Sequence, residues 1–172
     1  VHKVHLRDAS NLYAYQKLVA SLDAADQSPV VSIVQAAPEE VQDGAPAPIG
    51  DLRERWRRMT DVHQFFGLLK SLRLWRRQAV RMVGEDYAWL LDRDCVSAMF
   101  HQAAEQQIPI MVFVGNRGCI QIHSGPVTSI KPMGPWLNVM DETFHLHLRL
   151  DHIREVWAVR KPASEGHVTS LE

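Results

Sequence analysis

The feature that most limits the fold of this chain is a change of hydrophobic period near Ile108. Before this residue, apolar side chains recur every three to four positions, the spacing that places them on one side of a helix. After it, short apolar runs alternate with turns rich in Gly, Pro, Asp and Ser, which is typical of antiparallel strands. Helices followed by a run of strands predict an α+β fold, an antiparallel β-sheet meander with a group of helices packed on one side.

Five helices are expected in the first part of the chain. The first covers residues 8–23, and Asp8 or Ser10 can cap it. The later helices are expected at residues 52–59, 62–72, 75–83 and 95–107, with caps expected from Asp51, from Thr60 or Asp61, and from Asp94. Between the first two helices, residues 30–35 form a short strand candidate. Residues 36–50 contain three prolines and two glycines, which indicates a linker and the main boundary.

The second part of the chain predicts a series of strands. Residues 110–114 and 119–123 flank a turn at 115–118, which indicates a hairpin. Further strands are expected at residues 127–130, 137–140, 144–150, 155–160 and 168–171. The chain starts without Met and ends within an expected strand, so we interpret it as a piece of a longer protein.

The overall composition narrows the class of protein. Hydrophobic residues make up 46% of the 172 residues and charged residues 23%, which suits one globular domain and excludes a disordered chain or a coiled coil. The net charge of −1 gives no global attraction to DNA or to an anionic membrane. No run approaches the roughly 20 apolar residues that span a bilayer. Two cysteines without a Cys-x-x-Cys pair favour a reducing compartment, and we expect a cytoplasmic protein.

Standard catalytic motifs are missing, so the histidines are the first candidates for chemistry. No Gly-x-Ser-x-Gly, His-Glu-x-x-His, Walker or dinucleotide-binding pattern occurs in the sequence. His145 and His147 lie two residues apart on an expected strand and face the same way, with His123 as a third candidate ligand for a divalent metal such as zinc or copper. The alternative is an ordinary polar sheet face, which produces the same alternation.

His63 is the more informative histidine. It is expected in the first turn of a helix, beside an apolar stripe that includes Phe65 and Leu69. Its neighbour one turn on is Gly67, which leaves room for a flat ligand, and the helix N-terminus favours the neutral imidazole that can bind iron. The alternative is a surface or capping histidine, which the spacing alone favours.

Arginines form a second candidate group. Arg76, Arg77 and Arg81 fall on the next expected helix and Arg73 lies just before it, and their guanidinium groups match carboxylates of a ligand. A solvated helix face explains the same pattern. Together with residues 53–58 these arginines also permit a DNA- or protein-binding regulatory module, although the net charge makes DNA a weak choice.

Longer segments resemble a known family. The segment Thr60-Asp-Val-His-Gln-Phe-Phe66 is similar to the haem-binding helix of the cytoplasmic haemin-degrading and haem-trafficking proteins of the HemS/ChuS/PhuS/HmuS group. The resemblance continues through residues 109–127 (PIMVFVGNRGCIQIHSGPV), 131–138 (KPMGPWLN), 155–162 (EVWAVRKP) and 168–172 (VTSLE). It covers at least residues 51–172.

The resemblance implies a fold and a site. Members contain two similar α+β halves and bind haem between them. This chain resembles the C-terminal half, a haem-binding domain over residues 51–172 truncated at its end, preceded by an inter-half segment over 1–50. By resemblance, His63 is the axial iron ligand, Arg76 and Lys161 contact propionates, and Phe113 lines the macrocycle. The family's distal arginine belongs to the N-terminal half, and further propionate contacts follow the segment at 168–172.

The resemblance also implies a function and partners. Haem is expected as ligand or substrate, in intracellular haem trafficking, in oxidative haem degradation that releases iron after import, or in both. A haem oxygenase-like activity is an expectation for the full-length protein only. This chain by itself is expected to bind haem without degrading it. The partners implied are haem, a haem oxygenase or an importer component, and the N-terminal half of the same protein. A homodimer is a further alternative, and no membrane insertion is expected.

Overall fold

The structure is a computed structural model that describes residues 5–28, 48–116 and 118–172. The chain divides into two compact units, Val1–Gln42 and Asp43–Glu172. The expected strand at 30–35 lies outside the described residues, as does most of the expected linker. Among the described residues, no helix is long and apolar enough to cross a membrane.

The first unit contains one described helix, α1 (Leu12–Leu22). Its N-cap is Asn11, whose side chain accepts a hydrogen bond from the Ala14 N–H at 2.9 Å. The expected cap at Asp8 or Ser10 was therefore wrong, because the Ser10 hydroxyl instead accepts from the Arg7 N–H within the preceding turn. None of the side chains of α1 is buried.

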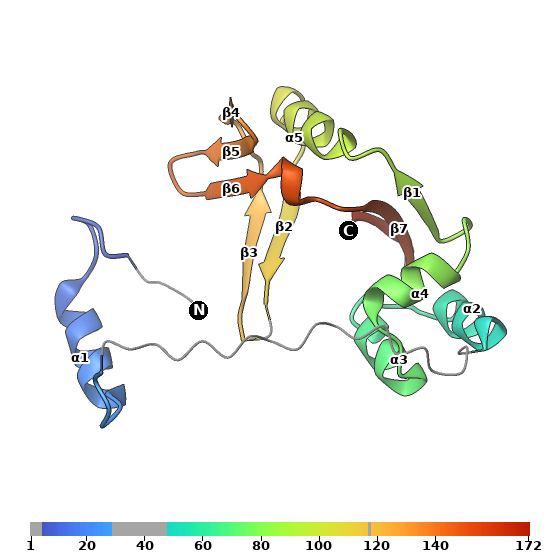
Figure 1. The fold of residues 1–172 in the computed structure, drawn as a ribbon, viewed down its shortest axis with the longest axis horizontal. Coiled ribbons are helices and arrows are strands. Elements are labelled where there is room, and N and C mark those ends of the chain that lie inside the picture. The colour runs from blue at the N-terminus through green and yellow to red at the C-terminus, as the bar shows by residue number, and fades with distance from the viewer. Residues whose placement is uncertain (1–4, 29–47, 117) are drawn as a thin grey trace. The chain divides into compact units, whose positions relative to one another are not determined.

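The second unit holds the remaining described helices and strands (Figure 1). In chain order they are α2 (Ile49–Arg57), α3 (Gln64–Leu72), α4 (Arg76–Met82), β1 (Ala88–Leu91), α5 (Cys95–Glu105), β2 (Ile110–Gly115), β3 (Ile120–Gly125), β4 (Ile130–Met133), β5 (Trp136–Met140), β6 (His145–Arg149), the 3-10 turn η1 (Leu150–His152), β7 (Val156–Ala163) and β8 (Gly166–Leu171). Neighbouring strands are antiparallel throughout. The α+β class is confirmed.

The strands form three sheets rather than one continuous meander. Their orders are β1-β7-β8, β2-β3 and β4-β5-β6. Strand β1 was not predicted from the sequence, because four residues are too few to show a clear period. It pairs with β7 far along the chain, with Ala88 opposite Val159. A strand from the helical region therefore ties the helices to the last hairpin.

The fourth strand starts three residues later than expected. The sequence predicts residues 127–130, whereas β4 begins at Ile130. The N–H groups of Thr128 and Ser129 donate instead to the Asp141 carboxylate, at 3.1 and 2.7 Å. Burial raises the pKa of the Asp141 carboxyl, but a hydrogen bond from the Thr128 hydroxyl, together with those from the two N–H groups, outweighs burial and lowers it. A side-chain acceptor thus takes the place of a strand partner.

Helix α2 starts before its expected cap, whereas α5 starts at its expected one. Helix α2 begins after Pro48, not after Asp51, and the Asp51 carboxylate pairs with Arg55 at 3.0 Å inside the helix. Helix α5 follows Asp94 as expected, but the Asp94 side chain makes no capping hydrogen bond. The Asp94 N–H donates to the Asp92 carboxylate at 2.8 Å.

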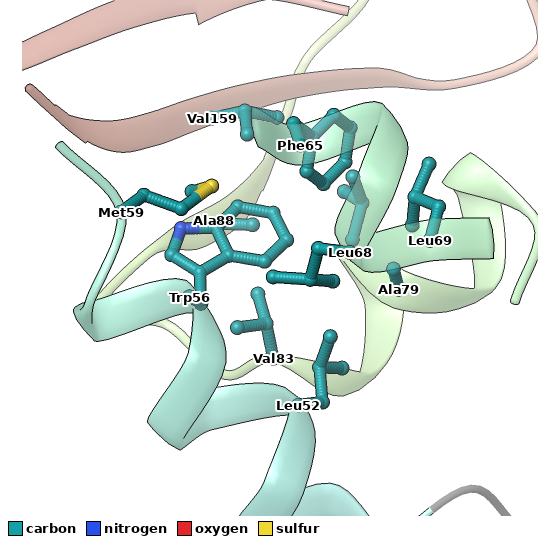
Figure 2. Close-up of a cluster of buried hydrophobic side chains, with 11 residues drawn as sticks. Leu52, Trp56, Met59, Phe65, Leu68, Leu69, Ala79, Val83, Ala88 and Val159 are labelled. Carbon is teal, nitrogen blue, oxygen red and sulfur yellow. The ribbon is translucent and has the colours of Figure 1, made fainter. Parts of the chain in front are cut away.

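One hydrophobic core joins the three helices α2, α3 and α4 to strands β1 and β7 (Figure 2). Trp56 of α2 and Phe65 of α3 meet edge to face, with ring centroids 4.9 Å apart and an interplanar angle of 71°. The Trp56 indole also donates to the Arg160 carbonyl on β7 at 2.9 Å. Trp56 is fully buried and Phe65 is 1% exposed. The ring contact with Phe65 and the hydrogen bond to Arg160 together fix the position of α3 against β7.

A second core packs α5 against the strands that follow it. Its buried members are Val96, Phe100, Ala103, Val127, Leu137, Val139 and Val156. Leu137 and Val139 alternate with polar Asn138 along β5, so that one face of the β4-β5-β6 sheet carries this core.

Candidate functional site

His63 occupies the N-cap position of α3, and its side chain is 87% exposed. One oxygen of the Asp61 carboxylate accepts a hydrogen bond from the His63 backbone N–H and lies 2.7 Å from the ring nitrogen Nδ1. These two contacts lower the pKa of the Asp61 carboxyl. Because a carboxylate only accepts hydrogen bonds, we assign the ring proton to Nδ1. The neutral ring then keeps its lone pair on Nε2.

The turn that carries His63 is stabilised by Gln64. The Gln64 side-chain oxygen accepts from the Thr60 N–H at 2.9 Å, and its nitrogen donates to the Thr60 hydroxyl at 3.3 Å. This exchange resembles a capping box, since a polar side chain inside the helix bonds back to the preceding turn. The Gln64 hydrogen bonds therefore stabilise the turn, and the Asp61 contact orients the imidazole.

The helix surface beside His63 is apolar and open. Phe66, three residues on, is 62% exposed. At Gly67, four residues on, an added Cβ would meet no atom within 4 Å apart from its chain neighbours and the local helix backbone. Residues three and four positions apart share one side of a helix, so His63, Phe66 and Gly67 form one surface. A flat ligand can approach the imidazole over it.

A cluster of charged side chains lies beside the two phenylalanines of α3. The Arg76 guanidinium at the start of α4 donates to the Glu172 carboxylate at 2.7 Å, and the Lys161 ammonium on β7 donates to its other oxygen. The Arg76 carbon Cζ lies 5.3 Å from the ring centroids of both Phe65 and Phe66, and the Lys161 nitrogen lies 4.8 Å from that of Phe65. We call Arg76, Lys161 and Glu172 the cationic cluster.

Glu172 was not singled out as a site residue by the sequence. Its backbone forms two hydrogen bonds with Trp157, each of 2.9 Å, which extend the β7-β8 pairing by one residue. Its side chain is 14% exposed. Burial raises the pKa of its carboxyl, but the hydrogen bond and charge of Lys161 and the charge of Arg76 outweigh burial and lower it. Only the pairing of β8 with β7 brings this carboxylate to the two cations.

Phe113 lies apart from the cationic cluster, in the β2-β3 sheet. It is 56% exposed and stands opposite Ile122. Met111 and Ile120 fall on the same face and are also exposed, which gives the hairpin an apolar surface. Of the four residues that the resemblance names, the structure brings Arg76 and Lys161 together through Glu172 and over the ring of Phe65, two residues after His63.

The histidines of the metal alternative are occupied by other contacts. The His123 ring stacks on Phe144, with centroids 3.8 Å apart. His147 places its Nδ1 2.7 Å from the side-chain oxygen of Asn138 on the neighbouring strand. Within residues 5–28, 48–116 and 118–172, no three His, Cys, Asp or Glu side chains are grouped to hold a metal ion.

The arginines of the DNA alternative are largely paired with acidic groups of the same unit. On α2 and at its C-cap Arg58, the pairs are Arg53 with Asp86, Arg55 with Asp51, and Arg57 and Arg58 with Glu54. On α4 they are Arg76 with Glu172 and Arg81 with Glu155. These pairs reduce the positive charge that the two helices could offer to phosphates.

A hollow of about 540 Å³ lies on another part of the second unit. It is lined by Trp136, His147, Leu148, Arg149, His152 and Ile153. None of the residues named by the resemblance lines it, so we do not place the site there.

The fold and the site together define a class of protein. Helices α3 and α4 and strand β7 present an imidazole oriented by a carboxylate, an open apolar surface and a pair of cations. These features suit a flat, anionic ligand that contains a metal. The sequence model of the haemin-degrading HemS.ChuX domain matches residues 73–172. The chain belongs to this family.

Alignments with individual relatives also cover the residues before Arg73. The chain is 40% identical to the hemin transport protein HmuS of Yersinia pestis over 172 residues, which are all of this chain and 49% of that protein. It is 43% identical to holo-PhuS, a heme-binding protein from Pseudomonas aeruginosa, with a TM-score of 0.86 over 97% of this chain and 49% of that one. For ChuS, the heme degrading enzyme of Escherichia coli O157:H7, the identity is 38% and the TM-score 0.80 over 97% and 47%. The chain thus spans about half the length of these relatives.

Proposed function

We propose that this chain binds haem, with Nε2 of His63 as an axial ligand of the iron. The observation that carries the proposal is the 2.7 Å contact between His63 Nδ1 and the Asp61 carboxylate. Histidines that bind metals commonly donate their other ring N–H to a carboxylate, which fixes the tautomer and strengthens the ligand. A histidine that merely caps α3 would need no such partner, and the His63 side chain makes no capping hydrogen bond.

The other described residues fit a haem at this position. The open surface over Phe66 and Gly67 suits the face of the macrocycle, and Arg76 and Lys161 suit the propionates. We assign Phe113 to the macrocycle lining on the family resemblance. Bound haem supplies an iron centre that can activate O₂, and the haem itself is then the substrate. This chain's own residues bind and orient it.

Two roles remain for a protein that binds haem in this way, trafficking and oxidative degradation. HmuS is a hemin transport protein, and ChuS has been described as a heme oxygenase. We favour binding and transfer for this chain, because the imidazole is highly exposed and can meet a second protein. We place this role in the cytoplasm, as the family resemblance implies. Biliverdin and CO formed from haem with ascorbate and O₂ would instead favour degradation.

The partners follow from the proposed role. We propose residues 51–172 as the C-terminal haem-binding domain and residues 1–50 as the inter-half segment. Since His63 is 87% exposed, a second wall for the haem has to come from elsewhere. The N-terminal half of the same protein is our first choice, and a haem oxygenase or an importer component would receive or deliver the haem.

The test of the proposed function is a haemin titration of the full chain. We expect a clear shift of the Soret band with the unaltered chain, and its loss or strong change in His63→Ala, because the iron loses its imidazole. His167→Ala is the matched control, since His167 is an exposed histidine on β8. Identical spectra for the unaltered chain and His63→Ala would rule out His63 as the ligand.

A second prediction concerns Asp61. We expect Asp61→Ala to weaken haem binding by roughly 10- to 100-fold, as is usual when the partner of a metal-binding histidine is removed. Asp61→Asn should lose less, because its amide oxygen can still accept the Nδ1 proton. Affinities from absorbance titrations measure both effects. If Asp61→Ala binds haem as tightly as the unaltered chain, the carboxylate has no role in orienting the ligand.

A further inference from the structure

The cationic cluster has an acid at its centre. Glu172 uses one carboxylate oxygen for Arg76 and the other for Lys161, and the Ser170 hydroxyl donates to the second oxygen at 3.1 Å. The three charged groups come from α4, from β7 and from the residue after β8. The carboxylate is therefore the common contact of two cations that the chain contributes from separate elements.

The arrangement leaves hydrogen-bonding capacity for a ligand. A guanidinium has five N–H donors and an ammonium three, and Glu172 has only two oxygens to accept them. Lys161 is 9% exposed and Arg76 is 45% exposed, so the outer part of the cluster is open to solvent at Arg76. With two positive charges and one negative, the cluster still attracts a carboxylate.

We propose that Glu172 is a positioning residue for haem propionates, which holds Arg76 and Lys161 at a fixed spacing so that both present their remaining donors to the ligand. The inference rests on the proposed function and deepens it. Without Glu172, the two cations repel each other, and the long side chain of Arg76 has to be ordered when the ligand binds. Ordering Arg76 when the ligand binds costs free energy and weakens binding. With Glu172 present, Arg76 is already ordered in the folded chain, so binding does not carry this cost.

The experiment compares two ligands, haemin and haemin dimethyl ester, on the full chain. The ester lacks the propionate charges but keeps the iron and the macrocycle. We expect Glu172→Gln to weaken haemin binding by about tenfold, the size of one charge-assisted hydrogen bond, and to leave binding of the ester unchanged. The Soret maximum of the haemin complex should not move, because Glu172 does not touch the iron.

A second variant covers the case in which Glu172→Gln does not fold. Glu172→Asp keeps the negative charge beside Lys161, but its shorter side chain cannot span both cations. It should show a smaller loss, again for haemin alone. Glu155→Gln is the matched control, because Glu155 pairs with Arg81 of α4 in the same way and lies outside the cationic cluster. It should leave the ratio of the two affinities unchanged.

The outcomes separate the positioning role from the proposed function. An equal loss for both ligands would show that Glu172 matters for the fold alone, and tighter haemin binding in Glu172→Gln would show that it competes with propionates. Either result, or no change at all in either variant, overturns the inference. If instead the unaltered chain binds neither ligand, or binds them without His63, the proposed function itself fails.

Discussion

Trp56→Ala is expected to lower the free energy of unfolding of the second unit by about 3–5 kcal/mol, the usual cost of removing a buried large aromatic side chain. Trp56 is fully buried, contacts Phe65 edge to face and donates a hydrogen bond to Arg160. Its removal leaves a cavity between α2, α3 and β7, together with an unpaired carbonyl. Urea unfolding followed by circular dichroism measures the loss.

Two further variants separate the contributions to this effect. Trp56→Phe keeps much of the ring but loses the indole N–H, so it should cost less, about 1–3 kcal/mol for the unsatisfied Arg160 carbonyl. Trp75→Ala removes the same side chain at a position that is 45% exposed and should have a small effect. If Trp56→Ala were no more harmful than Trp75→Ala, the core in Figure 2 would not be what holds α3.

The helices could be predicted from the sequence because their signals are local. The stripe with Phe65 and Leu69 indicated α3, and the structure begins that helix at Gln64, two residues after the predicted start at 62. The ends were harder to predict. Asp51 looks like a cap, but Pro48 already starts α2, and a carboxylate near a helix start is equally favourable inside the first turn.

The sheet arrangement could not be predicted in the same way, because pairing depends on distant residues. β1 takes its place from β7, about seventy positions away, and its own four residues carry no clear pattern. The alternating residues of β4 to β6 predicted strands but not which sheet they join. The three separate sheets are thus a property of long-range register.

The candidate site shows the same division. Asp61 and His63 are two residues apart, and their contact could have been anticipated from the spacing. Glu172 could not, since it reaches Arg76 and Lys161 only through the register of β8 on β7, in which Lys161 stands opposite Val168. The residues around Glu172 in the sequence therefore do not indicate which side chains its carboxylate contacts.

The largest effect expected at the site itself comes from breaking the Lys161–Glu172 pair. The Lys161 side chain is 9% exposed, and Glu172→Gln removes its negative partner. Loss of one member of a buried pair lowers the free energy of unfolding by about 3–5 kcal/mol. Adding Lys161→Met should recover most of this loss, because the double variant has no unpaired buried charge. Urea unfolding of both single variants and the double variant checks the coupling. Additive effects would mean that the two side chains do not interact.

The same pair gives the stability a dependence on pH. The folded-state pKa of the Glu172 carboxyl lies below its ordinary value, mainly because Lys161 and Arg76 outweigh the effect of burial. A lowered carboxyl pKa stabilises the fold fully above the ordinary pKa of about 4.3, and this stabilisation is lost as the pH falls through the lower folded value. Unfolding free energies between about pH 7 and pH 3 should therefore fall less steeply in Glu172→Gln than in the unaltered chain. Glu165→Gln serves as the control, because Glu165 is exposed in the turn between β7 and β8 and its removal should leave the slope almost unchanged. Parallel pH profiles for the unaltered chain and Glu172→Gln would show that the charge on Glu172 does not stabilise the cluster.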